Sequence, residues 1–372
     1  KNVKQTLHFV KVLIWYLSMK LRILLLTLIS ALILSSCGSD TRSLEGLAAD
    51  IYSDECSSKN GRSVTIYSGR KENLILPVIE AFTCETGTEV QVRWGASTDL
   101  ALLLNEEGEK TQADVFLSRS PGPVGYLELK GLLGTISSET LELVDQQNRA
   151  ADGTWVGFSG RRRVLVYNVD EYSPADLPDS VFDLTSEEFK NKVALPGTNG
   201  SFIDWFTILM DQYGEDAANE WIENMVANGA RYYPNNRSIV EAVGRGEISM
   251  GLVNHYYNYQ EKAANGSEHR AENFDFRNND IGSLLIITAA TILESSTNVE
   301  AAEDFLQYLL SSSVQEYFTN QTYEYPIAAG VSPNSALPEL GTFGVGSVSF
   351  DELGGGFEEA SRIIEASGIL NE

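Results

Sequence analysis

The fold is decided by residues 64–94, which read VTIYSGRKENLILPVIEAFTCETGTEVQVRW. The apolar run at 64–67 predicts a strand, the segment at 74–85 a helix, and the run at 89–94 a second strand. A strand, a helix and a strand in this order indicate a βαβ unit, which pairs its strands in parallel and covers them with the helix. The folded part of the chain therefore begins as an α/β protein.

The same alternation continues toward the C-terminus. We predict helices at 98–107 and 202–213, and strands at 114–117, 163–167, 193–195, 247–253 and 282–290. A chain of 372 residues is too long for a single core, so we expect two α/β lobes joined by strands that cross between them. We place lobe 1 at 62–160, lobe 2 at 161–280, the return to lobe 1 through the hinge at 281–330, and C-terminal helices packing on lobe 2 at 331–372.

The N-terminus carries an export signal. Apolar residues 21–34 follow the basic stretch MKLR at 19–22, and LSSC at 34–37 matches a bacterial lipobox. The apolar segment is too short for a membrane-spanning helix. We expect a signal segment at 1–36 with the true start at Met19, lipidation of Cys37, and a polar linker at 37–61. The alternative is a signal anchor that is never cleaved.

Composition agrees with an exported, acidic protein. The chain has 27 Lys and Arg against 52 Asp and Glu, a formal charge of -25. This charge repels nucleic acid, so we exclude a nucleic-acid-binding function. Apart from Cys37, the cysteines are Cys56 and Cys84, an even pair that is expected to form a disulfide in an oxidising compartment. Two buried free thiols are the alternative.

Two adjacent tyrosines, Tyr256 and Tyr257, are the candidate metal ligands. A phenol ionises only near pH 10 in water, but a trivalent cation such as Fe(III) binds the phenolate form. Side chains that are neighbours on a strand point to opposite faces. Both phenols can therefore reach one ion only where the buried run at 247–253 ends in a turn or a helix start. Tyrosine pairs also occur as core residues or as groups that stack on organic ligands.

Several short segments, taken in their order and spacing, resemble the bacterial periplasmic ferric-ion-binding proteins, the iron receptors of ABC importers. The segments are VTIYSG (64–69), ADVF (113–116), SGRRRVLVYN (159–168), NGSF (199–202), VGRGEI (243–248), NHYY (254–257) and EYP (324–326). The resemblance implies the type II periplasmic-binding-protein fold, with two lobes that are each a mixed, mostly parallel sheet flanked by helices. It further implies a monomer that binds Fe(III) with a synergistic anion such as carbonate and serves an ABC permease and ATPase.

The resemblance also assigns site residues. Ligands of open α/β sheets bind beyond the C-terminal ends of the strands, often at a helix N-terminus. Tyr256 and Tyr257 are implied as metal ligands, and the anion is expected on Arg70 and on the helix start formed by Asn199, Gly200 and Ser201. Residues with supporting roles are Tyr67, Arg119, Arg161, Asn236, Asn254 and His255.

The chain departs from the family pattern at two positions. Typical members carry a His shortly after the first strand and a Glu after the Asp-Val-Phe strand. The corresponding segments here are SGRKE at 68–72 and LSRS at 117–120, which supply cations instead. We therefore expect a tyrosine-based shell, with Tyr67, Tyr259 and Tyr325 as further candidates.

Two other functions compete with iron binding. The first is a receptor of the same fold for an organic anion or a sugar, in which the tyrosines stack on the ligand. The second is an enzyme, which would need a general base in the cleft. The sequence contains no Gly-x-Ser-x-Gly elbow, no Walker loop and no cluster of His and Cys, so we expect neither catalysis nor a zinc or copper site.

Overall fold

The computed structural model describes residues 43–339 and 356–371, and the residues from Leu44 onward form one compact unit. The expected signal segment at 1–36 and the expected lipidation site at Cys37 lie outside the described residues. Within the described ranges, no helix is both long enough and apolar enough to cross a membrane.

The first half of the sheet contains the βαβ unit that opens the fold. Strand β1 (Ser63–Ser68) pairs in parallel with β2 (Glu89–Trp94) and β3 (Val115–Ser118). The helices that follow these strands are α3 (Glu72–Thr86), α4 (Ser97–Glu107), α5 (Pro121–Leu129) and α6 (Ser138–Leu141). Every strand and helix predicted between residues 64 and 117 is present, with boundaries that shift by only one or two residues.

The second half of the sheet repeats this arrangement. Strand β5 (Val193–Leu195) pairs in parallel with β6 (Arg231–Tyr232) and β7 (Met250–Asn254). Its helices are α7 (Gly200–Tyr213), α8 (Glu215–Ala227), α9 (Asn236–Gly244) and α10 (His255–Asn265). Strand β7 begins three residues later than predicted because the chain still turns at Gly246, whose φ is 71°, a value that favours glycine.

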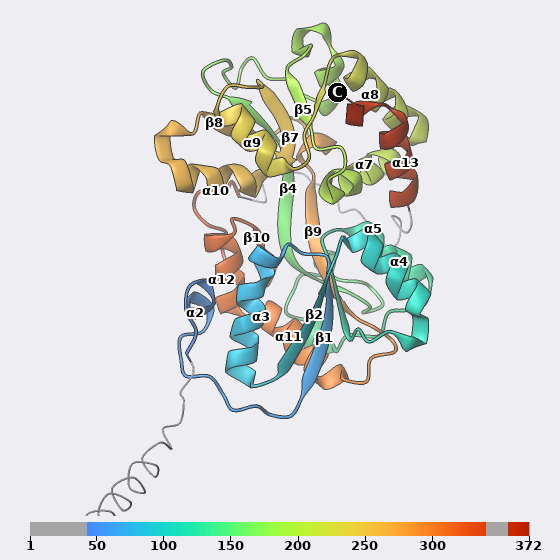
Figure 1. Ribbon diagram of the computed structural model, residues 1–372, viewed down its shortest axis with the longest axis vertical. Coiled ribbons are helices and arrows are strands. Elements are labelled where there is room, and N and C mark those ends of the chain that lie inside the picture. The colour runs from blue at the N-terminus through green and yellow to red at the C-terminus, as the bar shows by residue number, and fades with distance from the viewer. Residues whose placement is uncertain (1–42, 340–355, 372) are drawn as a thin grey trace, which may run out of the picture. The chain divides into compact units, whose positions relative to one another are not determined.

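Two long strands join the halves (Figure 1). Strand β4 (Val156–Asn168) is buried along its whole length; it pairs with β9 (Leu285–Ile292) through Arg162 and with β7 from Arg163 onward. Strands β8 (Ala271–Phe274) and β10 (Tyr325–Pro326) also pair with β4. The strand order is β2-β1-β3-β9-β4-β7-β5-β6. The predicted two-lobed α/β fold with crossing strands is confirmed.

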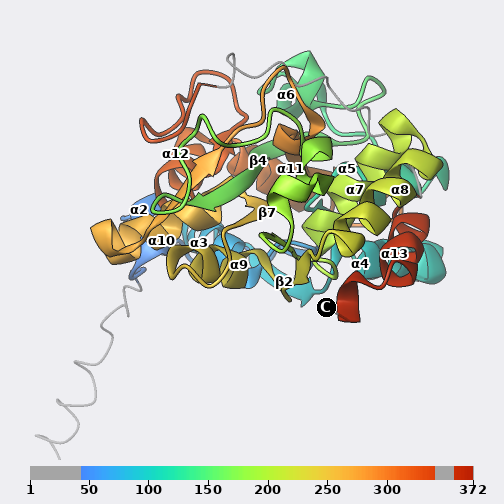
Figure 2. The ribbon, with the colours of Figure 1, turned by 90° about the horizontal axis from the view of Figure 1, so that it is seen from above.

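Helices lie around the strands on more than one side (Figures 1 and 2). In the first lobe, Phe82 of α3 packs against aromatic residues of α11 (Val299–Leu309), and α12 (Ser312–Gln321) adds to the same core. In the second lobe, α13 (Phe357–Ala366) packs on α7, and its Ile363 and Ile364 join the core around Trp205. Each half therefore has a core of its own. Burial of each large apolar side chain in these cores contributes roughly 1.5–3 kcal/mol.

The segment before β1 corrects one expectation. Residues 37–61 were predicted to be a polar linker, but α2 (Leu47–Ile51) packs on α3, and Ile51 is 7 % exposed within the first core. A disulfide joins Cys56 to Cys84 of α3. The linker prediction is therefore wrong from Leu44 onward, because the apolar side chains of this short helix bury against the lobe.

Candidate functional site

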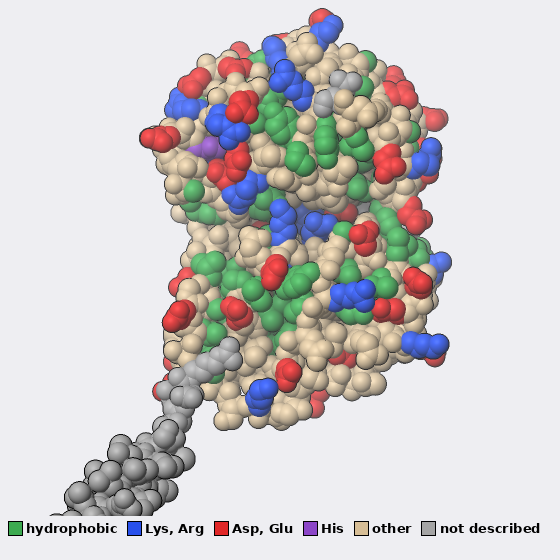
Figure 3. Space-filling view, viewed as in Figure 1, with side chains coloured by type: hydrophobic (Ala, Val, Ile, Leu, Met, Phe, Trp, Pro, Cys, Tyr) green, Lys and Arg blue, Asp and Glu red, His purple; other side chains and the backbone are tan. Residues whose placement is uncertain are grey.

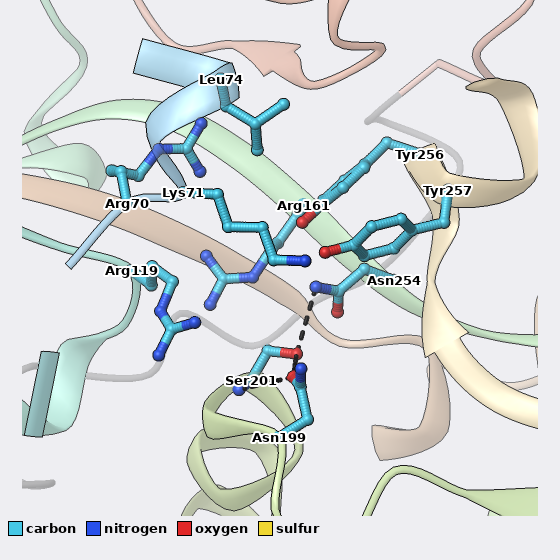
Figure 4. Close-up of a pocket in the computed structure, with 10 residues that line it drawn as sticks. All are labelled: Arg70, Lys71, Leu74, Arg119, Arg161, Asn199, Ser201, Asn254, Tyr256 and Tyr257. Atoms are coloured by element: carbon cyan, nitrogen blue, oxygen red, sulfur yellow. Dashed lines mark hydrogen bonds between the residues drawn. The ribbon is translucent and has the colours of Figure 1, made fainter. Parts of the chain in front are cut away.

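A small pocket, partly open to solvent, lies beside β4 at the C-terminal ends of the strands of both halves. Figure 4 shows the residues that line it, and Figure 3 shows Lys and Arg side chains gathered at the middle of the molecule. The lining residues are Arg70, Lys71, Leu74, Arg119, Arg161, Asn199, Ser201, Asn254, Tyr256 and Tyr257.

Tyr256 and Tyr257 occupy the first turn of α10, directly after Asn254 ends β7. Successive residues of a helix are separated by about 100° around its axis instead of lying on opposite faces. The two rings consequently lie side by side, with centroids 4.4 Å apart and planes tilted by 35°. Both hydroxyls point into the pocket (Figure 4). The junction of strand and helix thus gives the geometry in which two neighbouring phenols can reach one ion.

Burial controls the ionisation of this pair. Both tyrosines are 4 % exposed. Burial, and after it the neighbouring phenol of Tyr257, raise the pKa of Tyr256 above its usual value, while the charge of Arg161 acts in the opposite direction. Phenolates at neutral pH therefore require a strong positive charge between the two oxygens. Among the described residues, no group of three or more His, Cys, Asp or Glu side chains could hold a metal ion.

Arg161 extends from β4 into the centre of the pocket (Figure 4) and is 1 % exposed. None of its three guanidinium nitrogens has a hydrogen-bond partner among the described residues. Its one ion pair is long, with 3.6 Å between Nη2 and Oδ2 of Asp204. Burial lowers the pKa of Arg161, and the attraction of Asp204 opposes this effect. Buried donors without partners are costly, so this guanidinium is suited to an anion in the pocket.

Two more cations reach the pocket from the first lobe. Lys71 precedes α3, and its Nζ lies 5.1 Å from the centre of the Tyr257 ring. Arg119 follows β3 and lies against the start of α7. A Cβ placed on Gly200 would stand 2.4 Å from Nη2 of Arg119, so glycine at this position permits the close approach. Burial lowers the pKa of Lys71, and the Tyr256 phenol opposes this shift.

The position of Arg70 corrects its expected role. Its Nη1 and Nη2 donate to the two carboxylate oxygens of Glu324 at 2.9 and 2.6 Å. The two side chains are 2 % and 0 % exposed, and Ser159 and Thr322 also donate to Glu324. The Arg70 guanidinium, which was expected to hold an anion, is already bonded to Glu324, a buried carboxylate in the segment between α12 and β10.

A network of amides supports the second-lobe side of the pocket. Asn199 caps α7, and its Oδ1 accepts from the backbone and hydroxyl of Ser201 and from Nδ2 of Asn236. Asn254 donates to the Ser201 hydroxyl at 3.2 Å. Arg163 of β4 donates to Oδ1 of Asn236 and to the carbonyl oxygen of Ser201. These bonds fix the starts of α7 and α9, and they use the Ser201 amide that was expected to face an anion.

Four candidates lie outside the pocket. The Tyr67 hydroxyl donates to Glu107 at 3.0 Å, within the first lobe. His255 accepts from the backbone N–H of Arg162, burial lowers its pKa to about 3, and its ring stacks on Tyr325. Tyr259 stacks on Tyr323. None of these four side chains lines the pocket. His255 and Tyr259 lie on α10, the helix that carries the tyrosine pair, and Tyr325 stacks on His255, whereas Tyr67 belongs to the core of the first lobe.

Sequence reasoning missed Lys71, Leu74, Arg163, Asp204 and Glu324. Glu324 lies in the quoted segment EYP, but its partner Arg70 is 254 residues away, and a sequence gives no signal for such a pairing. Lys71 directly follows Arg70 in a turn, where a lysine usually faces solvent. The useful signal was the triple arginine at 161–163, directly at the start of the strand predicted at 163–167, since charged residues in a buried strand require partners or a ligand.

Comparison with known proteins identifies the family. The family model described as bacterial extracellular solute-binding protein matches residues 110–346. The chain belongs to this family. An Fe(3+)-binding periplasmic protein of Serratia marcescens is 30% identical over 281 residues, which are 75% of this chain and 83% of the relative. The expected kinship with periplasmic ferric-ion-binding proteins is confirmed, and the relatives are solute-binding transport proteins, not enzymes, as predicted.

Solved structures give the same result for the fold. Iron-bound HitA from Pseudomonas aeruginosa has a TM-score of 0.77 and 30% identity, covering 82% of this chain and 99% of that chain. The IdiA (FutA) protein of Trichodesmium, in complex with iron and citrate, has a TM-score of 0.69 and 27% identity, covering 82% and 99%. This chain is therefore similar over nearly the full length of two iron-bound proteins.

Proposed function

We propose that this family member is an extracytoplasmic receptor that binds Fe(III) with an anion in the pocket between its lobes and delivers it to an ABC importer. The observation that carries the proposal is the pair Tyr256 and Tyr257, whose hydroxyls face one pocket from the first turn of α10. Two phenolates are hard, anionic ligands suited to a trivalent ion. The ferric-iron-binding relatives support the same cargo.

The anion would complete the iron shell on the side opposite the tyrosines. Carbonate is the anion expected from the resemblance, and the start of α7 at Asn199, Gly200 and Ser201 offers it the positive end of a helix, while the Ser201 amide itself is bonded to Asn199. Guanidinium groups beside this helix start supply charge-assisted hydrogen bonds. Arg70 contributes indirectly, because its ion pair with Glu324 holds the turn that carries Lys71.

Location follows from the N-terminal signal. Cleavage before Cys37 and lipidation of this residue would anchor a monomer to a membrane, in the periplasm or at the cell surface, within reach of a permease and an ATPase. We propose lobe 1 at 62–160, with the segment from Leu44 packed on it, lobe 2 at 161–280 and the return at 281–330, with the described helix of the segment 331–372 on lobe 2. The periplasmic relatives support this location.

A second candidate function is a receptor for an organic anion without iron. The observation that favours it is the lining of the pocket, where four residues are basic and none is acidic. In that case the phenols would donate hydrogen bonds to the ligand and the guanidinium groups would bind its acidic groups.

Titration of the purified, metal-free protein with Fe(III), with and without bicarbonate, separates the two functions. Iron on phenolate ligands produces a visible charge-transfer band with a stoichiometry of one iron per chain, and the band should strengthen with bicarbonate. No band with Fe(III), together with thermal stabilisation by an organic anion, would favour the second function. Titration with Ga(III), which has the same charge but no such band, controls for metal binding without colour.

A further inference from the structure

Asp204 is a buried carboxylate that lies beside the pocket without lining it. It belongs to the second turn of α7, four residues after Gly200, and is 6 % exposed. Residues four positions apart share one face of a helix, so Asp204 and Gly200 lie on the same side of α7. Arg119 of the first lobe approaches that side at Gly200. The carboxylate therefore lies where α7 faces the cations of the pocket.

The contact between Asp204 and Arg161 is an ion pair without a hydrogen bond. The distance from Oδ2 of Asp204 to Nη2 of Arg161 is 3.6 Å, which is longer than a hydrogen bond. Among the described residues, Oδ2 has no hydrogen-bond partner, and the same holds for all three guanidinium nitrogens of Arg161. An anion that accepts hydrogen bonds from this guanidinium gains contacts that Asp204 does not make. Asp204 and such an anion therefore compete for Arg161.

Building on the proposed function, we propose that Asp204 is an internal competitor for Arg161, which keeps the anion site empty until a metal ion occupies the tyrosine pair. An anion bound to Arg161 lies close to the Asp204 carboxylate, and two negative charges repel each other strongly in a buried site. A ferric ion on two phenolates carries one net positive charge, which offsets this repulsion. Asp204 thus makes anion binding depend on the metal.

The basic lining of the pocket shows why such a competitor is useful. Four lining residues are basic and none is acidic. Cationic pockets attract small anions whether or not a metal is present. A receptor that filled with free anions would present the same occupied site without its metal. The carboxylate of Asp204 lowers the charge behind the pocket by one and lies against the guanidinium on which the anion would bind.

Protonation of Asp204 should remove this competition. The groups that face the carboxylate are Arg161 and Arg163 of β4, and Arg119 and Ser120 of the turn after β3. Burial raises the pKa of Asp204 above its ordinary value, while Arg161 and the other cations oppose this shift. A carboxyl with a raised pKa takes up its proton at a higher pH than an exposed aspartate does. The affinity of the metal-free protein for anions should therefore rise as the pH falls.

Calorimetry of sulfate binding to the metal-free full chain tests the proposal. Sulfate keeps its charge over the range from about pH 5 to pH 8, and about 0.15 M sodium chloride screens distant charges. At neutral pH we expect weak binding to the parent and to Asp204→Glu, which retains the charge. Asp204→Asn should bind sulfate at least about tenfold more tightly. Asp211→Asn is the matched control, because it removes an exposed carboxylate from the same helix and should change nothing.

Two further measurements show whether the effect acts through Arg161. Addition of Arg161→Gln to Asp204→Asn should abolish the gain in sulfate affinity, and a gain that persists would overturn the inference. The parent should bind sulfate more tightly as the pH falls, whereas Asp204→Asn should bind it tightly throughout. If Asp204→Asn fails to fold, the parent profile decides, and a flat profile overturns the inference.

The iron titration separates failure of this inference from failure of the proposed function. Equal sulfate affinity in the parent and in Asp204→Asn, with the charge-transfer band of iron present in both, would overturn the competitor and leave the iron receptor intact. Tighter sulfate binding in Asp204→Asn, with no iron band in the parent, would instead refute the iron function and leave Asp204 as a competitor in an anion site.

Discussion

Breaking the ion pair between Arg70 and Glu324 should strongly destabilise the first lobe. Both side chains are at most 2 % exposed, and two hydrogen bonds of 2.9 and 2.6 Å join them. Glu324→Gln keeps the shape of the side chain but leaves the Arg70 guanidinium buried without a counter-charge, near Arg161. Removing one partner of a buried pair costs about 3–5 kcal/mol, which is a large fraction of the typical stability of a folded protein.

Urea denaturation followed by fluorescence and circular dichroism measures this loss. Glu300→Gln is the matched control, because Glu300 pairs with Arg62 at 3.2 Å while its side chain is 84% exposed; removal of such a surface pair changes stability by about 1 kcal/mol or less. The turn that carries Lys71 should also loosen in Glu324→Gln, so iron binding should weaken. A loss of less than about 1 kcal/mol in Glu324→Gln would refute the reasoning that this pair is buried and irreplaceable.

Three further predictions concern other parts of the chain. Cys56→Ser opens a disulfide whose cysteines are 28 residues apart and should lower the free energy of unfolding by about 3 to 4 kcal/mol; an equal loss in Cys84→Ser and in the double variant checks that the pair acts as one unit. Because burial holds the pKa of His255 at about 3, below its unfolded value near 6.5, the unfolded chain takes up a proton first on acidification. Stability should therefore fall as the pH drops from 6.5 toward 3, and denaturation of His255→Phe should show a shallower pH dependence. Gly200→Ala should weaken cargo binding without loss of stability; unchanged binding would mean that Arg119 does not hold the cargo.

The sequence predicted the fold well because local patterns determine it. The strand and helix patterns of residues 64–94 agree with the place of this unit in the sheet. The observed boundaries of its strands and helix differ from the predicted boundaries by at most two residues. The polar appearance of residues 37–61 was misleading, because Ile51 and Cys56 attach this segment to α3. A few apolar residues in a polar segment give no pattern from which burial can be predicted.

The site was predictable only where neighbours in sequence are neighbours in space. Tyr256 and Tyr257 lie together because a helix begins at His255, and that junction follows from the end of a predicted strand. The role of Arg70 could not be predicted, because its partner Glu324 comes from the far end of the fold. The role of Lys71 could not be predicted either, because its side chain reaches the pocket only through the way the start of α3 faces the second lobe.

The most direct test of the central claim is the visible spectrum of Tyr256→Phe, Tyr257→Phe and the double variant in the presence of Fe(III). A phenyl ring retains the packing of these buried residues and removes only the oxygen, so circular dichroism and thermal unfolding should match the parent protein closely. The account predicts a charge-transfer band in the parent protein, a weaker band with iron affinity reduced by orders of magnitude in each single variant, and no band in the double variant. Parental colour and iron affinity in the folded double variant would show that these two tyrosines do not bind the metal.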